Sequence, residues 1–210
     1  MNAATITIGE CRASYVSILQ PKPPFNAPGG DPKYSLTVLV PKSNAAAKAA
    51  IDAAVQAAME AGVSKAWNGQ RPPMPALCVH DGDAPRPSDG QPYGPECHGH
   101  WVFTASSKAD RPPFVVDASV QKIINPAEIY SGMYCNVNVT FFAYNNSGKK
   151  GVGCGLNGVQ KTRDGEPLGG GITAEEAFQA VGQPPAPTGW TAGPITGWTV
   201  DPITGLPIQR

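Results

Sequence analysis

The segment MYCNVNVTFFAY, residues 133 to 144, decides the fold class because its side chains alternate with a period of two. Successive side chains of a strand point to opposite faces, so one face of this predicted strand is apolar and the other is mixed. The apolar face holds Met133, Cys135, Val137, Val139 and Phe141, and the opposite face holds Tyr134, Asn136, Asn138, Thr140, Phe142 and Tyr144. The segment therefore predicts a strand whose second face displays three aromatic rings.

A second strand is predicted directly after the first. NNSG, residues 145 to 148, is typical of a tight turn, and KKGVGCGLNGVQK, residues 149 to 161, alternates apolar residues with glycines. Glycine has no side chain, so the face opposite the apolar residues is bare. Residues 133 to 163 are therefore predicted to form a β-hairpin whose bare face lets a ligand approach the backbone closely.

Further strand-like segments flank this hairpin, and the first of them is interrupted by a glycine that favours a bulge, Gly9. They cover residues 5–19, 33–41, 100–106 and 114–124. Residues 67–99 hold many prolines without a sustained period, so we expect a long irregular excursion there. Several strands with little helix predict a mainly β fold with minor α, built as a small β-barrel or Greek-key sheet with long loop insertions.

One strong helix is predicted over residues 43–61, SNAAAKAAIDAAVQAAMEA. Ser43 or Asn44 is the expected N-cap, and Gly62 is the expected C-terminal stop. Ile51, Val55 and Met59 form a narrow apolar stripe flanked by alanines. Such a stripe predicts a helix that lies close against the sheet.

Composition limits the class of protein. The chain has 210 residues with 24 glycines and 23 prolines, and only 15% of its residues are charged, which argues against an all-helical bundle. Sixteen basic and sixteen acidic side chains give no net charge, so any polyanion must be held by a local patch. The five cysteines are scattered and odd in number, which favours free thiols in a reducing compartment. The first residues resemble no signal peptide, and we expect a cytoplasmic protein.

The C-terminal part is expected to differ from the rest. Residues 173–181 predict a short helix, with Thr173 and Glu176 in capping-box spacing. Residues 182–210 are rich in proline, glycine and threonine and carry only Asp201 and Arg210 as charges, a composition that predicts a flexible tail. We therefore expect one domain over residues 1–181 and a tail over 182–210.

The predicted hairpin combines the two features that a single-stranded nucleic acid needs. Rings stack on bases of any sequence, and lysine and arginine contact phosphates. The cations near these rings are Lys149, Lys150, Lys161 and Arg163. Two alternatives stay open: the rings could cover a second layer of the fold, and the cations could form a solvated edge that deters strand pairing.

Another cluster suggests a metal site: Cys78, His80, Cys97, His98 and His100 lie within a short stretch. Their spacing lacks the C-x2-C pairs typical of zinc sites, so free thiols and ordinary loop histidines are favoured. Asp81, Gly82 and Asp83 predict an Asx-type turn rather than a calcium loop. The sequence contains no G-x-S-x-G motif, no P-loop and no dinucleotide fingerprint, so we expect neither an enzyme nor a cofactor.

Several blocks in order resemble one family of phage single-stranded DNA-binding proteins. The blocks are PKYSLTVLVPK at 32–42, HDGD at 80–83, HWVFTASSK at 100–108, FFAYN at 141–145 and GVGCGLNGVQKTRDGEPLGGG at 151–171. The resemblance spans about residues 5–181. It implies an OB-fold-like five-stranded barrel that coats single-stranded DNA during phage replication, recombination or repair, without catalysis.

The resemblance and the residue pattern together give a set of expected DNA-binding residues. The set is Trp101, Phe103, Lys108, Arg111, Tyr134, Phe142, Tyr144, Lys149, Lys150, Lys161 and Arg163. The expected partners are single-stranded DNA and phage replication or recombination proteins, with a homodimer left open. The nearly uncharged tail argues against recruitment through an acidic terminus. Two rival interpretations also stay open, a zinc-binding structural protein and a structural virion or assembly protein.

Overall fold

Seven strands, one α-helix and two short 3-10 helices make up the part of the chain that the computed structural model describes, residues 3–24 and 28–169. The strands are β1 (Thr5–Lys22), β2 (Lys33–Pro41), β3 (His80–Asp81), β4 (His100–Lys108), β5 (Phe114–Val116), β6 (Tyr134–Asn146) and β7 (Lys149–Arg163). The helices are α1 (Ala45–Lys65), η1 (Pro95–Cys97) and η2 (Pro126–Glu128). The predicted helix at 173–181 and the tail at 182–210 lie outside the described residues.

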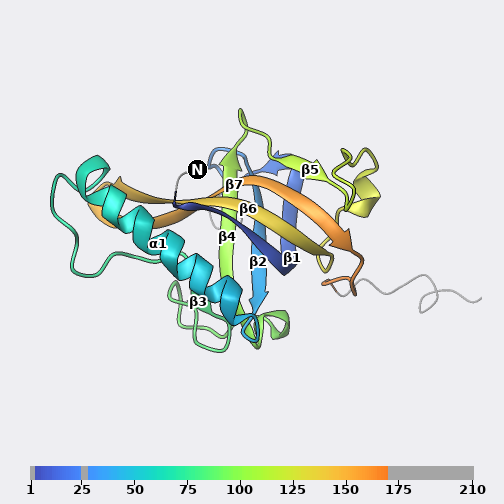
Figure 1. Cartoon of the computed structure of the whole chain (residues 1–210), viewed down its shortest axis with the longest axis horizontal. Helices are drawn as coiled ribbons and strands as arrows, with labels where there is room; N and C mark the ends of the chain where they lie inside the picture. Colours follow the sequence, from blue (N-terminus) through green and yellow to red (C-terminus); the bar gives the residue numbers. More distant parts are fainter. Residues whose placement is uncertain (1–2, 25–27, 170–210) are drawn as a thin grey trace, which may run out of the picture. The chain divides into compact units, whose positions relative to one another are not determined.

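Five of the strands close into a barrel. The order β4-β2-β1-β6-β7 is antiparallel throughout, and β4 then meets β7 in a parallel pairing at Ser106 and Gly155. The two extra strands are β3, which pairs with β4, and β5, which pairs with β7. In Figure 1 the long β6–β7 hairpin crosses β4, β2 and β1. The predicted OB-fold-like barrel of a mainly β protein is confirmed.

The strands with clear alternation lie where the sequence predicts them. β2 covers the predicted residues, and in β6 the residues from Cys135 to Phe141 alternate between buried and half-buried as expected. The turn between β6 and β7 consists of Ser147 and Gly148, whose φ angles of 49° and 86° are those of a type I′ hairpin turn. The predicted bulge near Gly9 is confirmed, because the pairing of β1 with β6 shifts register between Ile8 and Cys11.

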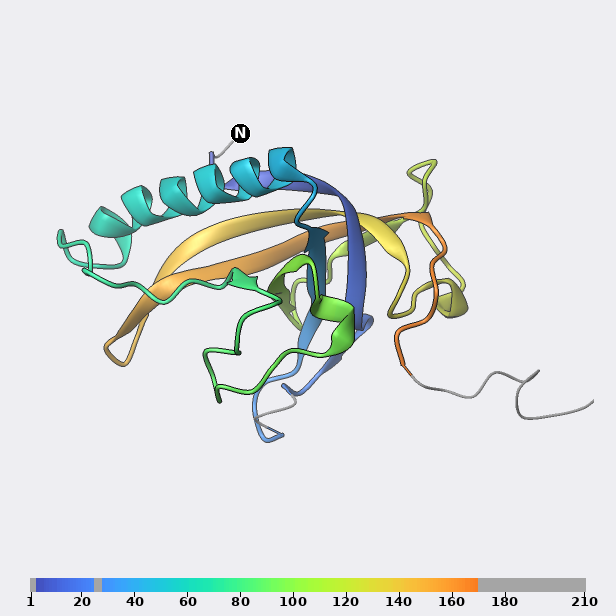
Figure 2. The same cartoon turned by 90° about the horizontal axis from the view of Figure 1, so that it is seen from below.

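Helix α1 packs along the β6–β7 hairpin (Figure 2), as its apolar stripe predicts. Asn44 is the N-cap, with its side-chain oxygen accepting a hydrogen bond from the amide of Ala47 at 3.1 Å. The prediction that Gly62 ends the helix is wrong, because α1 continues to Lys65. A Cβ at Gly62 would clash with the Cβ of Ala143 on β6, so this glycine allows the helix to approach the strand.

Gly62→Ala tests that close approach. Alanine in place of glycine favours a helix by up to about 1 kcal/mol, but forcing a methyl group into a packed interface costs about 1–3 kcal/mol. We expect a net loss of about 1 kcal/mol in the free energy of unfolding, measured by chemical denaturation. In the double variant Gly62→Ala/Ala143→Gly the methyl moves to the opposite side of the contact, and part of the loss should return. A single variant more stable than the parent would contradict the contact.

The predicted strand over residues 114–124 is too long. β5 ends at Val116, because the Asp117 carboxylate accepts hydrogen bonds at 2.8 Å from the amides of both Ser119 and Gln121. These bonds fold the chain back on itself, and Lys122 forms an isolated bridge with Val116. Aspartate as a side-chain acceptor at a turn therefore overrides the strand propensity of the residues that follow.

The irregular excursion predicted over residues 67–99 contains only the two-residue strand β3 and the short helix η1. Trp67, which is fully buried, fixes its start, and its indole N–H donates to the carbonyl of Tyr144 at 3.0 Å. The backbone of Ala76 pairs with the free edge of β7, where it bonds to Lys150 and Val152. The excursion thus lies against the hairpin and against the barrel.

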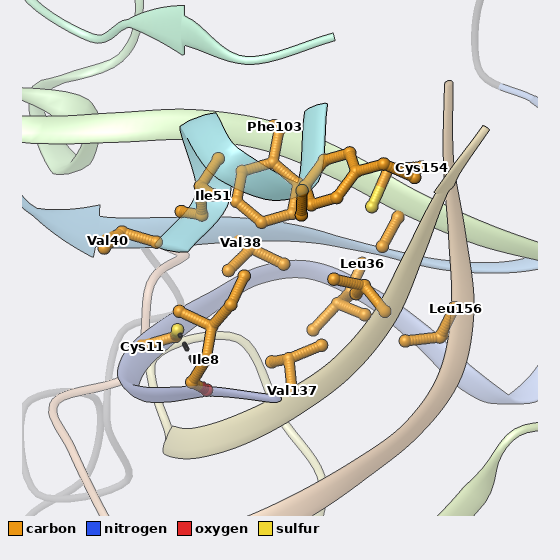
Figure 3. Packing of buried hydrophobic residues seen from close by; sticks show 14 of the residues in the cluster. Ile8, Cys11, Leu36, Val38, Val40, Ile51, Phe103, Val137, Cys154 and Leu156 are labelled. Carbon is orange, nitrogen blue, oxygen red and sulfur yellow. Dashed lines mark hydrogen bonds between the residues drawn. The ribbon is translucent and has the colours of Figure 1, made fainter. Parts of the chain in front are cut away.

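The core fills the barrel and the space beneath α1 (Figure 3). Phe103 lies in it at 1% exposure, with its ring centroid 6.0 Å from that of Phe141. The five cysteines are free thiols, as expected, and only Cys78 is more than slightly exposed. In the described residues no helix has the length and apolar character that crossing a membrane requires.

Candidate nucleic-acid interface

Three aromatic rings lie over the glycines of β7. A Cβ at Gly153 would lie 2.9 Å from the Phe142 ring, and one at Gly151 would lie 2.7 Å from the hydroxyl of Tyr144. The ring of Phe114 occupies the equivalent space over Gly158. Each glycine therefore provides the room in which a ring lies against the strand. Phe142 is 47% exposed and Phe114 is 56% exposed, so these two rings do not cover a second layer of the fold.

Phe142 lines a groove of about 580 Å³ at the closure of the barrel, which we call the Phe142 groove. One wall consists of the end of β4 and the loop after it, and the other consists of β6 and β7. The wall from β4 contributes Lys108 and Arg111, both exposed and, within the described residues, without an ion pair. An exposed ring beside two available cations is the combination that stacking and phosphate contact require.

A stripe of amide and hydroxyl groups runs beside the Phe142 groove on the outer face of the sheet. Asn157 donates at 2.9 Å both to the side-chain oxygen of Asn138 and to the hydroxyl of Thr140. Asn138 in turn donates to the hydroxyl of Thr7 at 2.8 Å. These bonds hold the amides in fixed orientations beside the groove.

Other predicted site residues lie at the tip of the hairpin. Tyr144 is half-buried over Gly151, and Lys149 and Lys150 follow the turn. Lys149 is exposed and Lys150 half-buried, and neither forms an ion pair within the described part of the chain. The tip therefore offers two further cations beside a ring, beyond the Phe142 groove.

The cations at the other end of the hairpin already have partners. Lys161 forms an ion pair with Asp164 at 2.7 Å, and its side chain is only 12% exposed. Its hydrogen bond holds the pKa of Asp164 below the ordinary value. The guanidinium of Arg163 lies 3.3 Å from the centroid of the Tyr134 ring and covers one face of that ring. Tyr134 and Lys161 are thus less available to a ligand than Phe142 and Lys108, whereas Arg163 stays exposed beside the Tyr134 ring.

Two expected residues lie apart from the Phe142 groove. On β4 the side chains of Phe103 and Ala105 point into the core, whereas Thr104 and Lys108 are exposed. The buried ring of Phe103 has no free face for a base, so we leave it out of the interface. Trp101 is half-buried, with the ammonium groups of Lys42 and Lys48 5.2 and 4.4 Å from its ring centroid.

The cysteine and histidine cluster does not assemble into a metal site in the part of the chain that the structure describes. His98 instead lies 3.1 Å from the carboxylate of Asp83. Burial raises the pKa of both the Cys78 and the Cys97 thiols to about 11. The predicted Asx turn is confirmed by a 2.8 Å bond from the amide of Asp83 to the Asp81 side chain.

Sequence reasoning missed Phe114, whose ring lies in line with those of Phe142 and Tyr144. Its position depends on the parallel pairing of β5 with β7, which sets Phe114 opposite Gly158. The segments are far apart in the chain and β5 has only three residues. No local pattern signals such a pairing, although an aromatic residue and a glycine are the pair that the contact needs.

Comparison with known proteins gives a consistent result. The model of a family described as "Enterobacter phage Enc34, ssDNA-binding protein" matches residues 4–186. Among solved structures, the single-stranded DNA-binding protein from bacteriophage Enc34 in complex with ssDNA is 29% identical, with a TM-score of 0.66 over 80% of this chain and 90% of that one.

Two further matches are more limited. The single-stranded DNA-binding protein gp2.5 of bacteriophage T7 is 16% identical, with a TM-score of 0.50 over 90% of this chain and 98% of that chain, and this likeness concerns the fold alone. "Putative protein p50" of Acyrthosiphon pisum secondary endosymbiont phage 1 is 38% identical over 104 residues. That match spans 49% of this chain and 51% of the curated relative, so it covers about half the length of each.

Proposed function

Because the chain belongs to the family of single-stranded DNA-binding proteins represented by that of Enterobacter phage Enc34, we propose that it binds single-stranded DNA with little sequence preference. The observation that carries this proposal is the Phe142 groove, where an exposed ring lies beside Lys108 and Arg111. In this proposal the protein protects single-stranded DNA during phage replication, recombination or repair.

The chemistry of the groove explains why binding would be insensitive to sequence. Every base has a π-face, and stacking on an aromatic side chain contributes about 1–3 kcal/mol per base. Phosphate contacts carry no sequence information. The amides of Asn138 and Asn157 are engaged with each other and with hydroxyl groups, so few donors remain to read base edges.

The cations available for phosphates are few but grouped. Lys22, Lys33 and Lys108 are exposed and lie next to one another across β1, β2 and β4 in the strand register. Paired residues of neighbouring strands share a face, so these three ammonium groups form a positive row. Arg111 follows at the end of this row. A neutral protein can hold a polyanion through such a local row.

The remaining parts of the proposal rest on the family and the sequence. We propose no catalytic step, and we place the protein in the cytoplasm of the infected bacterium. Residues 182–210 are proposed as a tail outside the binding domain of residues 1–181. Phage replication or recombination proteins are proposed as partners, with a homodimer left open.

A fluorescence titration with oligo-dT and with duplex DNA at two salt concentrations tests the function. We expect tight binding to oligo-dT and much weaker binding to the duplex, whose bases are not free to stack. A chain that binds neither would overturn the proposal. One equivalent of zinc by elemental analysis would support the zinc-binding rival, and a large oligomer that ignores DNA would support a structural virion protein.

The double variant Lys108→Ala/Arg111→Ala tests phosphate contact in the Phe142 groove. The slope of log K against log salt is expected to become shallower by about 1.4, since each lost contact with a single strand accounts for about 0.7. Affinity should fall equally for all sequences. The same titration of Lys149→Ala/Lys150→Ala measures contact at the tip of the hairpin.

Lys48→Ala is the matched control for this measurement. Lys48 is also basic, but it is ion-paired with Asp52 and lies over Trp101, away from the groove. Its salt slope should equal that of the parent. If the Lys108→Ala/Arg111→Ala variant also keeps the parental slope, the groove does not contact phosphates.

A further inference from the structure

The excursion between α1 and β4 forms a second groove, of about 570 Å³, on the outer face of β2 and β4. We call it the Tyr15 groove. Its floor includes Thr37 and Thr104, which are cross-strand partners with hydroxyl oxygens 3.4 Å apart. Its walls carry Tyr15 from β1 and Arg86 and Tyr93 from the excursion. Two phenol rings and a guanidinium thus surround a polar floor.

Tyr15 is displayed by a local distortion of β1. Its φ angle is 48°, and the pairing of β1 with β2 shifts register between Ser14 and Ser17. A positive φ is uncommon for a bulky residue and costs free energy, and a bulge of this kind redirects a side chain. Tyr15 is 75% exposed, so the distortion gains no burial for the ring. The strand instead presents a large aromatic ring to the groove.

Arg86 has an unused hydrogen-bond donor at the same place. One terminal nitrogen of its guanidinium bonds to the Asp89 carboxylate at 2.9 Å, but its Nε is shut off from solvent without a partner in the described residues. An enclosed donor without an acceptor is costly. Because Nε is enclosed, a ligand in the Tyr15 groove can meet only the exposed part of the Arg86 side chain, which is 42% exposed.

The two grooves are lined by neighbouring residues of β4. Thr104 lines the Tyr15 groove and Ser106 lines the Phe142 groove. Residues two apart on a strand point to the same face and lie about 7 Å apart. An extended ligand can therefore pass from one groove to the other over the outer face of β4, beside the row of Lys22, Lys33 and Lys108.

We propose that one strand of DNA occupies both grooves, and that Tyr15 and Tyr93 form a second stacking subsite for its bases. This inference rests on the proposed function and extends it, since the second subsite is built by the excursion of this chain and by the bulge of β1. Two carboxylates determine which part of a nucleotide the Tyr15 groove binds. Glu96 lines the Tyr15 groove and Asp89 neutralises Arg86, so the groove takes bases and leaves the phosphates to the lysine row.

Oligo-dT of increasing length tests this path. The parent chain is expected to gain affinity with length until the oligonucleotide reaches both grooves. Tyr15→Ala should lower the affinity for long oligonucleotides by about 5- to 150-fold, the equivalent of one lost stacked base, and should leave short ones unaffected. Because the subsite takes bases, the salt slope should stay that of the parent.

Tyr15→Phe is the matched control, since it keeps the ring and should bind as the parent does. Tyr15 is exposed, so its removal does not threaten the fold, and Tyr93→Ala serves as a second variant whose thermal unfolding is checked first. Parental affinity of Tyr15→Ala for long oligonucleotides, with weakened binding by Phe142→Ala, would overturn the second subsite and leave the proposed function intact. A parent chain that binds no oligonucleotide would overturn the proposed function itself.

Discussion

A chain carrying Phe142→Ala is expected to bind oligo-dT about 5- to 150-fold more weakly than the parent, because about 1–3 kcal/mol of base stacking is lost. The Phe142 ring lies over Gly153 with its outer side open to the groove. Alanine removes the platform without opening the core, because the side chain is half-exposed. The loss should be similar for oligo-dT and oligo-dC at any salt concentration, and a fluorescence titration measures it.

Two controls separate stacking from other effects. Met74 is 91% exposed and belongs to neither groove, so Met74→Ala should bind like the parent. Phe142→Trp keeps an aromatic platform and should retain most of the affinity. If Phe142→Ala binds as tightly as the parent while its thermal unfolding is also unchanged, DNA does not use this face of the hairpin.

Trp67→Ala is expected to lower the free energy of unfolding by about 3–5 kcal/mol, the range for removing a buried tryptophan. Trp67 is fully buried beneath the hairpin, close to the site where α1 approaches β6 at Gly62. Its loss leaves a cavity and also removes the only side-chain bond that the structure describes to the carbonyl of Tyr144. The excursion would lose the anchor at its start.

Chemical denaturation followed by circular dichroism measures this loss without relying on tryptophan fluorescence. Trp67→Phe keeps most of the buried volume and removes the hydrogen bond, which contributes about 0.5–1.5 kcal/mol, so it should be destabilised less than the alanine variant. Equal unfolding midpoints for the parent and Trp67→Ala would show that the excursion is not anchored there.

The elements that the sequence predicts well are those whose pattern repeats over many neighbouring residues. The alternation from Cys135 to Phe141 has no interruption. After the turn at Ser147 and Gly148, the apolar residues that alternate with glycines predict β7 as the second strand of the hairpin. The exposed face of Phe142 follows from the same alternation. Short-range periodicity was therefore sufficient for a mainly β fold and for the face on which Phe142 lies, whereas the five-stranded barrel was implied by the family resemblance.

What the sequence does not predict depends on contacts between distant segments. A glycine near the end of a helical pattern usually marks the end of the helix. Gly62 instead provides the room for Ala143 of β6 to approach the helix. Lys161 is basic in the sequence and paired in the structure, and only Asp164 three residues later hints at that pairing. The Tyr15 groove combines β1, β2, β4 and the excursion, and no stretch of sequence contains its pattern.

The barrel has one weak seam, the parallel join of β4 to β7, where a single residue pair, Ser106 and Gly155, connects the strands within the described chain. Both residues also line the Phe142 groove. In the proposed complex, a nucleic acid in the Phe142 groove would contact β4 and β7 on both sides of this pairing and bridge them. Under that proposal, ligand binding and closure of the barrel would stabilise each other.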